Sequence, residues 1–250
     1  MSVEWISPEW PAPTEVRAAS TLRRGGVSSG PYASLNLGAH VGDAPDAVAR
    51  NRALVANALE FEREPLWLQQ VHGAEVIRAD AGADAAQPTA DASVAFAPAR
   101  PCVVLTADCL PVLLCDRAGT RVAAAHAGWR GLARGVLQAT VARLACDPSQ
   151  LLAWLGPAIG PAAFEVGEEV RDIFVRADLE AVAAFERNPG GRWQADLYTL
   201  AKFVLGSVGV QSVYGGAHCT YAGATDFFSY RRDGATGRMA TMVWLSAQAR

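Results

Sequence analysis

The sequence predicts a mixed α/β (α+β) fold, in which packed mixed β-sheets are flanked by helices in a single domain spanning residues 1–250. Apolar runs rich in Val, Leu, Ala and Trp, bounded by Gly, Pro and Asp, alternate with segments of helical periodicity. The turn sequence DRAG at 116–119 joins two such runs into a hairpin, which a purely parallel sheet would lack. Finally, 51% of the chain is hydrophobic and no linker or repeat divides it, so one sizeable core is expected.

The strands are predicted from their composition and their Gly, Pro and Asp boundaries. They are expected at 65–72, 102–109, 111–116, 120–126, 151–160 and 239–246. One stretch, TADCLPVLLC at 106–115, is unusual because Asp108 and Cys109 interrupt an apolar run. We expect the first strand to end near Ala107 and Pro111 to mark the break before the next strand. Asp108 and Cys109 would then lie at a rim rather than in the core.

Helices are predicted between the strands, at 46–60, 132–145, 168–176, 177–187 and 196–209. The last begins with Asp196 as its expected N-cap and carries an apolar stripe on one face. The alanine-rich stretch 77–101 is expected to be loop and short strands. Hairpins and helices together favour mixed sheets.

Composition and charge exclude several classes of protein. The net charge of -3 argues against a dedicated nucleic-acid surface. No apolar run approaches the ~18 residues of a membrane span, and the N-terminus lacks the pattern of a signal peptide. The five cysteines form no CxxC pair and no evident disulfide framework. We therefore expect a cytoplasmic protein without membrane or nucleic-acid partners, and the oligomeric state cannot be predicted.

Three residues at predicted strand ends suggest a metal site. His72, Cys109 and His126 each lie beside Gly or Pro, and strand ends are where functional residues gather on a rigid scaffold. A thiolate with two imidazoles suits zinc or copper with an open fourth position. A buried, inert Cys109 is the plainer interpretation. His218 and Cys219 form a rival pair.

A nucleophilic hypothesis uses the same cysteine. Cys109 would be a thiolate activated by His126, with Asp108 or Asn36 orienting the base. Reactive thiolates usually lie in electropositive, accessible surroundings, and the flanking leucines argue mildly against this.

Two motifs suggest an anion site. TLRRGGVSSGPYASLNLG at 21–38 is a Gly/Ser-rich loop that carries Arg23 and Asn36. HAGWRG at 126–131 follows a predicted strand and precedes a helix, so Arg130 and free helix N–H groups could meet a phosphate or carboxylate. Ordinary surface turns explain both motifs equally well. Neither a Walker A loop nor GxGxxG occurs.

Taken together, the motifs resemble the YfiH-type laccase-domain family, in order and over nearly the whole chain. The strings that carry the resemblance are RRGGVSSGPYASLNLGAHVGDAPDAVARNR, QQVHG, TADCLPVLL, AAHAGWRGL, LGPAIGPAAFEVGEEV and FFSYRRDGATGRMA. Leu22 departs from the pattern, where a Thr is expected. The resemblance implies an architecture related to the cysteine-deamidase toxin domain. It also implies a metal site of His72 (QVHG), Cys109 (ADCLP) and His126 (HAGWRG).

The resemblance further implies three kinds of activity. One is phosphorolysis of adenosine, inosine, guanosine and methylthioadenosine, with adenosine deamination. The others are copper-dependent polyphenol oxidation, as in a laccase, and hydrolytic editing of peptidoglycan precursors. Four histidines are too few for a multicopper oxidase, so we discount the laccase chemistry.

Zinc suits deamination because it lowers the pKa of a coordinated water to ~7, and Asp108 is the nearest acid to move the proton. Phosphorolysis needs a positive pocket, for which Arg23 and Arg130 are expected to hold phosphate and Asn36 to contact sugar or base. We therefore expect a zinc-dependent purine nucleoside phosphorylase with adenosine deaminase activity, whose partners are a small nucleoside and phosphate. A copper enzyme and a peptidoglycan-precursor hydrolase are the competing hypotheses.

Overall fold

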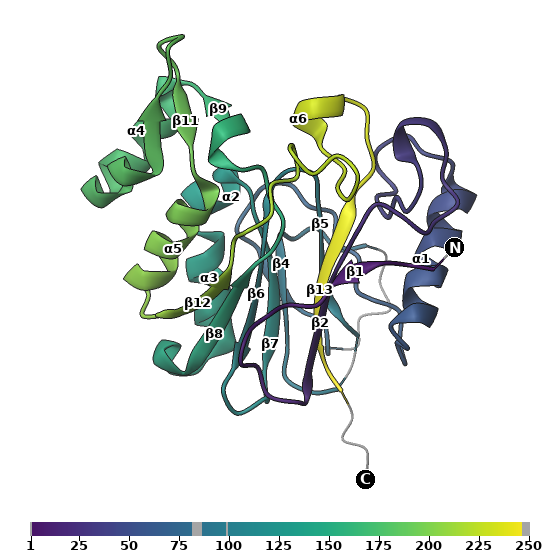
Figure 1. Ribbon diagram of the computed structural model, residues 1–250. Helices are drawn as coiled ribbons and strands as arrows, with labels where there is room; N and C mark the ends of the chain where they lie inside the picture. Colours follow the sequence, from purple (N-terminus) through teal and green to yellow (C-terminus); the bar gives the residue numbers. More distant parts are fainter. Residues whose placement is uncertain (1, 82–86, 99, 247–250) are drawn as a thin grey trace.

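The computed structural model describes residues 2–81, 87–98 and 100–246, and it confirms the mixed α/β class (Figure 1). The described residues form two large sheets and one small one. The six-stranded sheet has the order β12 (Ser212–Gly215), β8 (Leu151–Leu155), β6 (Leu110–Asp116), β7 (Val122–Ala127), β4 (Ala92–Ala95) and β3 (Val76–Arg78). The four-stranded sheet has the order β1 (Trp5–Ile6), β2 (Val16–Thr21), β13 (Met239–Leu245) and β5 (Cys102–Thr106). The three-stranded sheet has the order β10 (Phe185–Arg187), β11 (Trp193–Ala195) and β9 (Glu165–Val166).

Helices surround these sheets. The α-helices are α1 (Pro45–Ala58), α2 (Trp129–Ala133), α3 (Val136–Leu144), α4 (Glu168–Ala177), α5 (Leu197–Ser207) and α6 (Tyr230–Asp233). Short 3-10 helices are η1 (Gly30–Tyr32), η2 (Pro148–Gln150), η3 (Pro161–Ala163) and η4 (Leu179–Ala184).

Strand pairing in the six-stranded sheet is mixed, as predicted. β12 pairs with β8 and β3 pairs with β4 in parallel, whereas the remaining pairs are antiparallel. The expected hairpin is β6–β7, in which Pro111 lies opposite His126. This register brings the start of one strand beside the end of the next.

The two large sheets face each other and each carries helices on its outer side (Figure 1). Along β6, Leu113 and Cys115 pack between the sheets, while Leu114 points to the layer of α3 and α5. Along β5, Val104 points inward and Leu105 points toward the α1 side. Each buried Val or Leu side chain contributes roughly 1.5–3 kcal/mol, so this alternation holds the layers together.

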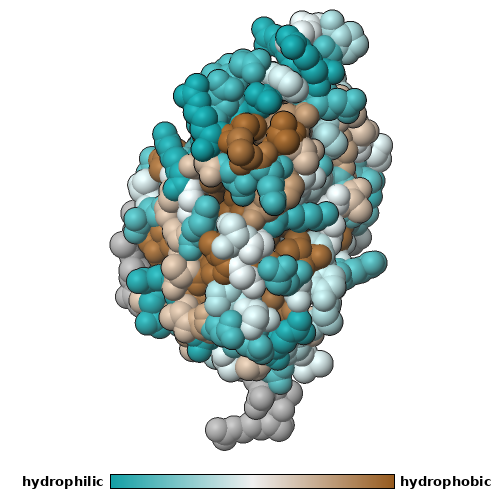
Figure 2. Space-filling model, turned by 90° about the vertical axis from the view of Figure 1, so that its left-hand side faces the viewer, coloured by the Kyte–Doolittle hydropathy of each residue, from teal (hydrophilic) through white to brown (hydrophobic). Residues whose placement is uncertain are grey.

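The outer face of the helical layer is mainly hydrophilic, with isolated hydrophobic patches (Figure 2). On α4 and η4, Ile173, Leu179 and Val182 are exposed. Single exposed apolar residues of this kind are common on protein surfaces.

Two helix predictions need correction. The segment 132–145 is not one helix, because Gly135 adopts a left-handed φ of 85° and separates α2 from α3. The segment 177–187 is a 3-10 helix followed by β10, since Asp178 ends α4 and caps the new turn by accepting from Glu180 N. Asp196 does cap α5, as predicted, by accepting from Tyr198 N and Thr199 N.

Three strand predictions also differ. The segment 65–72 has only isolated bridges, at Leu66 and Gln69. The segment 151–160 is strand only as far as Leu155, after which Gly156 and a proline follow. The break before β6 lies at 107–109, and Pro111 is already inside that strand.

Candidate active site

The site lies where the chain passes from one large sheet to the other. β5 belongs to the four-stranded sheet and β6 to the six-stranded sheet, and only residues 107–109 join them. Asp108 and Cys109 are partly exposed at this crossing, as the sequence predicted. The crossing therefore places an acid and a thiol at the rim between two cores.

His72, Cys109 and His126 come together there. Their possible ligand atoms all lie within 4.8 Å of one another, and Cys109 Sγ is 3.8 Å from His72 Nε2. The two imidazole rings meet edge-on, with centroids 4.7 Å apart. His72 has a left-handed φ of 58° in the turn after the Gln69 bridge, and His126 is in β7. Among the residues that the structure describes, this is the one group of its kind.

A carboxylate that the sequence reasoning missed, Asp91, holds two of these residues. Its Oδ1 lies 2.8 Å from His126 Nδ1 and accepts from His72 N, while Oδ2 accepts from Val71 N and Gly73 N. Metal-binding histidines usually donate their second ring nitrogen to such a group, which fixes the ring. That rule calls for a hydrogen-bond acceptor near His126, and a carboxylate is one such group. The 77–101 stretch, however, gave no periodic signal to single out Asp91.

Gly128 leaves room for the sulfur. A Cβ at this position would lie 2.6 Å from Cys109 Sγ and 3.5 Å from the ring of His72. Gly128 is also the N-cap residue of α2. The first glycine of HAGWRG therefore has two roles. It forms the turn that the motif predicted, and it leaves the space that the sulfur of Cys109 occupies.

The electrostatics of the trio favour a thiolate. Burial raises the pKa of Cys109, but the charge of His126 and the hydrogen bonds of both imidazoles outweigh it and lower this pKa to about 6. Burial lowers the pKa of His126, but the charge of Cys109 and the hydrogen bond to Asp91 raise it to about 9. The thiolate is the form of cysteine that binds metals.

The donor set fits a metal ion. Tetrahedral coordination at a Zn–S distance of ~2.3 Å and a Zn–N distance of ~2.1 Å places S and N about 3.6 Å apart. The 3.8 Å between Cys109 Sγ and His72 Nε2 is close to this value. Because Asp91 takes Nδ1 of His126, Nε2 remains for the ion. The three side chains can thus bind a metal while leaving a fourth position to the cavity.

A cavity of about 350 Å³ opens onto the trio. One wall contains Leu105, Gln70 and Arg238, on the α1 side of the four-stranded sheet. The opposite wall contains Trp129 and Phe164, which pack against the helical layer. Cavities of this size hold small molecules.

Asp108 and Arg130, both predicted at the site, line this cavity. Asp108 Oδ1 accepts from Thr220 Oγ1 at 2.6 Å, and Oδ2 accepts from Arg231 N at 2.8 Å. The guanidinium of Arg130 lies over the ring of Trp129, 4.4 Å from its centroid.

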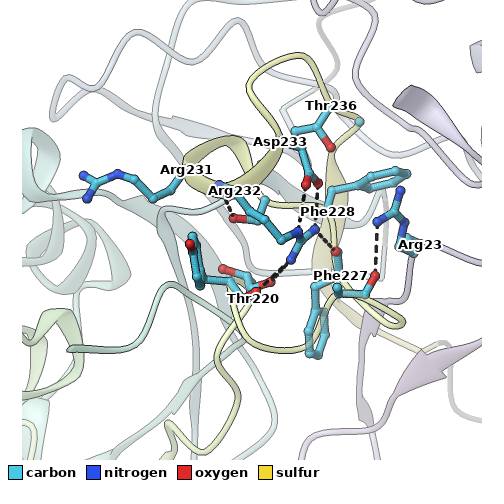
Figure 3. Close-up of polar contacts among 12 residues, drawn as sticks. Arg23, Thr220, Phe227, Phe228, Arg231, Arg232, Asp233 and Thr236 are labelled. Atoms are coloured by element: carbon cyan, nitrogen blue, oxygen red, sulfur yellow. Dashed lines mark hydrogen bonds and ion pairs between the residues drawn. The ribbon is translucent and has the colours of Figure 1, made fainter. Parts of the chain in front are cut away.

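The segment that contacts Asp108 is fixed by Arg232 (Figure 3). Its guanidinium donates to the carbonyls of Thr220, Tyr221 and Phe227 and pairs with Asp233. This network orients Thr220 and the backbone N of residue 231 toward Asp108. The string FFSYRRDG therefore has a structural role that its residue pattern did not suggest.

Arg23 and Asn36 are not among the described residues that line the cavity. Arg23 donates to the carbonyls of Ala33 and Ala224 and lies over Phe228 (Figure 3). Asn36 is fully buried within its own loop. Their predicted contacts with substrate stay predictions.

The rival pair and the nucleophilic hypothesis can also be compared with the structure. Cys219 Sγ accepts from Gly160 N and Ala222 N, and the pair His218–Cys219 does not join the metal trio. The nucleophilic hypothesis assigned Asp108 or Asn36 to orient His126. The residue that contacts Nδ1 of His126 is Asp91 instead.

The comparisons with known proteins agree on one family. Residues 17–246 match the family described as multi-copper polyphenol oxidoreductase laccase. A purine nucleoside phosphorylase of Pseudomonas aeruginosa is 56% identical over 96% of this chain and 98% of its own length. The purine nucleoside phosphorylase YfiH of Escherichia coli is 55% identical with the same coverage.

Solved structures extend the likeness to the fold. A Neisseria meningitidis protein of family DUF152 superposes with a TM-score of 0.94 at 53% identity, over 97% of this chain and 99% of its own. YlmD of Geobacillus stearothermophilus gives 0.89 at 31% identity, over 97% of this chain and 96% of its own. These matches confirm the resemblance to the YfiH-type family.

None of the helices in the described part of the chain has the length and apolar character needed to span a membrane.

Proposed function

The chain belongs to the multi-copper polyphenol oxidoreductase laccase family, and from this premise we propose that it is a zinc-dependent purine nucleoside phosphorylase. Its substrates would be adenosine, inosine, guanosine or methylthioadenosine together with phosphate. The names of relatives that are more than half identical over nearly the whole chain support the reaction class. The observation that carries the proposal is one cavity that combines the His–Cys–His trio with arginine side chains and an aromatic wall.

The residues of the cavity suit the steps of phosphorolysis. A phosphate oxygen forms a bond to C1′ of the ribose, the C1′–N9 bond breaks, and the purine leaves with the bonding electrons and gains a proton. Arginines in the cavity bind the phosphate dianion by charge-assisted hydrogen bonds. Trp129 and Phe164 offer faces for the purine ring. His72, Cys109 and His126 would hold zinc, which supplies Lewis-acid polarisation at this end of the cavity.

Asp108 is proposed as the residue that moves the proton. Thr220 and the backbone N of Arg231 fix its carboxylate at the cavity rim, beside Cys109. An acid held in this way can accept or donate a proton at a substrate nitrogen. Adenosine deamination needs a comparable proton transfer, so we propose it as a second activity of the same site.

Copper is the competing metal, because the family description names it. A multicopper oxidase requires several copper sites, whereas the described residues contain one group of three or more metal-binding side chains. This favours the phosphorylase over a laccase. We propose a single-domain enzyme of the reducing cytoplasm, because the family match runs unbroken over residues 17–246 and the five cysteines are free.

The test follows products from inosine and adenosine, each with phosphate. Hypoxanthine from inosine, and adenine and inosine from adenosine, are expected from the wild-type protein and not from Cys109→Ala. Cys146→Ala is the matched control, because this cysteine lies just after α3 and does not line the cavity. Elemental analysis is expected to find about one zinc per chain. Copper, with oxygen uptake on a phenol above that of free copper and no nucleoside cleavage, would overturn the proposal.

A further inference from the structure

Arg238, which lies directly before β13, was not among the predicted site residues. It lines the wall of the cavity that contains Gln70 and His40, and its side chain is partly buried. It forms no ion pair with a carboxylate of the described residues. A guanidinium removed from water without a negative partner is unfavourable, so an anionic ligand at this wall would stabilise it.

Only one end of the guanidinium is occupied. Nη1 donates to the carbonyls of Thr236 and Gly237, at 3.0 and 2.9 Å. Within the part of the chain that the structure describes, Nε and Nη2 donate no hydrogen bond. Nε–H and Nη2–H point along the same side of the planar group, which is the edge that binds phosphate in a bidentate manner.

The glycine-rich loop holds this arginine in place. Asn36 Oδ1 accepts from both Arg238 N and Gly38 N at 2.9 Å, and Leu37 N donates to the carbonyl of Arg238. A Cβ on Gly38 would lie 2.8 Å from Cγ of Arg238, so the loop packs directly on the arginine stem. The loop thus fixes both the backbone and the side chain of Arg238.

The remaining arginines of the cavity are less suited. Arg130 is exposed and lies over Trp129. Arg231 is exposed, and its Nη1 donates to the carbonyls of Ala163 and Glu165. Burial lowers the pKa of Arg238, whereas the negative charges of Cys109 and Asp108 raise it. The guanidinium of Arg238 is therefore close enough to the trio to interact with its charges.

We propose that Arg238 binds the phosphate co-substrate through its Nε–Nη2 edge, and that the Asn36 loop serves to position it. This inference rests on the proposed phosphorylase function and deepens it. The phosphate then lies on the α1 side of the cavity, which leaves the aromatic wall to the purine. The loop contributes to phosphate binding through Arg238, and not through Arg23 as the sequence suggested.

The test measures KM for phosphate and for inosine separately in zinc-loaded wild type, Arg238→Gln and Arg130→Gln. Arg238→Gln is expected to raise the phosphate KM by at least about tenfold, which is the loss expected for a charge-assisted hydrogen bond, while the inosine KM stays within about twofold. Arg238→Lys is expected to recover part of this loss, because it restores the charge without the bidentate edge. Arg130→Gln is expected to have the smaller effect. An unchanged phosphate KM in Arg238→Gln, or a larger effect in Arg130→Gln, overturns the proposal.

Two further measurements separate this proposal from the function. Calorimetric binding of inorganic phosphate without nucleoside is expected to be lost in Arg238→Gln. If wild type binds phosphate through Arg238 but cleaves no nucleoside, the proposed function fails and the anion site stands. If Arg238→Gln does not fold, Gly38→Ala displaces the arginine without removing its charge, and it is expected to raise the phosphate KM. A normal phosphate KM in folded Gly38→Ala counts against the proposal.

Discussion

Two buried polar side chains, Asp91 and Asn36, have comparable roles in different parts of the molecule. Both are 0% exposed and both collect backbone N–H groups. Asp91 accepts from His72 N and Gly73 N, and Asn36 accepts from Gly38 N and Arg238 N. Asp91 supports the metal trio beside strands β4 and β7, whereas Asn36 supports the cavity wall that contains Arg238.

The difference lies in what each side chain must hold. Asp91 contacts the ring of His126 directly, and an imidazole that binds a metal through Nε2 needs an acceptor at Nδ1. Asn36 also donates, to the carbonyl of Gly38 and to Asp43, so a second carboxylate there would repel Asp43. A charge is therefore used where a ligand must be polarised, and a neutral amide where only backbone must be fixed.

The largest loss of zinc affinity is expected from Gly128→Ala, which disturbs the metal trio directly. Its Cβ would lie 2.6 Å from Cys109 Sγ, so the sulfur must move and zinc affinity is expected to fall by about 100-fold. Zinc competition with a chelating dye measures this. Gly206→Ala in α5 is the control, because a Cβ there meets nothing within 4 Å, and it is expected to retain zinc. Normal zinc binding by Gly128→Ala would contradict the geometry of the trio.

Asp91→Asn is expected to lower zinc affinity by about 10–100-fold, because the amide no longer offers a charged acceptor to His126 Nδ1. The same change is expected to lower the free energy of unfolding by about 2 kcal/mol, measured by urea denaturation. Asp116→Asn is the matched control, since this buried carboxylate accepts, among the described residues, from Thr120 and Arg121 in the β6–β7 turn and not from the trio. It is expected to lose stability and keep zinc. Equal zinc loss in both variants would show that the effect is not specific to the trio.

Asn36→Ala tests the loop side of the comparison. It leaves the N–H groups of Arg238 and Gly38 without their acceptor, which is expected to cost about 1–3 kcal/mol of stability. The phosphate KM is expected to rise while the zinc content stays at the wild-type value. Asn57→Ala, on the exposed face of α1, is the control and is expected to change stability by less than about 0.5 kcal/mol. Zinc loss in Asn36→Ala would mean that the two regions are not independent.

The smallest effect is expected from Trp129→Leu, which alters the aromatic wall. The loss of a stacking partner worth about 0.5–1.5 kcal/mol is expected to raise the inosine KM several-fold and leave the phosphate KM unchanged. Steady-state kinetics with each substrate varied in turn measures this. Trp193→Leu in β11, outside the cavity wall, is expected to leave both values unchanged. A raised phosphate KM in Trp129→Leu would place the anion at the aromatic wall instead of beside Arg238.

Much of the fold could be predicted where the burial of one face gives the apolar residues a regular spacing along the sequence. The hairpin β6–β7, the strand β13 and the capped helix α5 are found near their predicted positions, because long apolar patterns and an Asp N-cap are local signals. Short strands were expected within 77–101, where β3 lies, but without bounds, and β9 was not predicted, since two or three residues cannot show alternation. The segment 65–72 was predicted as a strand from its apolar composition, but it pairs only through isolated bridges, and Val71 within it is exposed.

The sequence by itself determined the mixed α/β class, the rim position of Asp108 and Cys109, and the residue types for a His–Cys–His trio, because these follow from local patterning and ligand chemistry. Only the tertiary structure decided which partners complete them. Asp91 contacts His126 across 35 residues, and Asn36 contacts Arg238 across 202 residues. Such pairings carry no local periodicity, since they form only when two sheets and a loop pack together. The cavity therefore depends on long-range packing, which local sequence patterns do not predict.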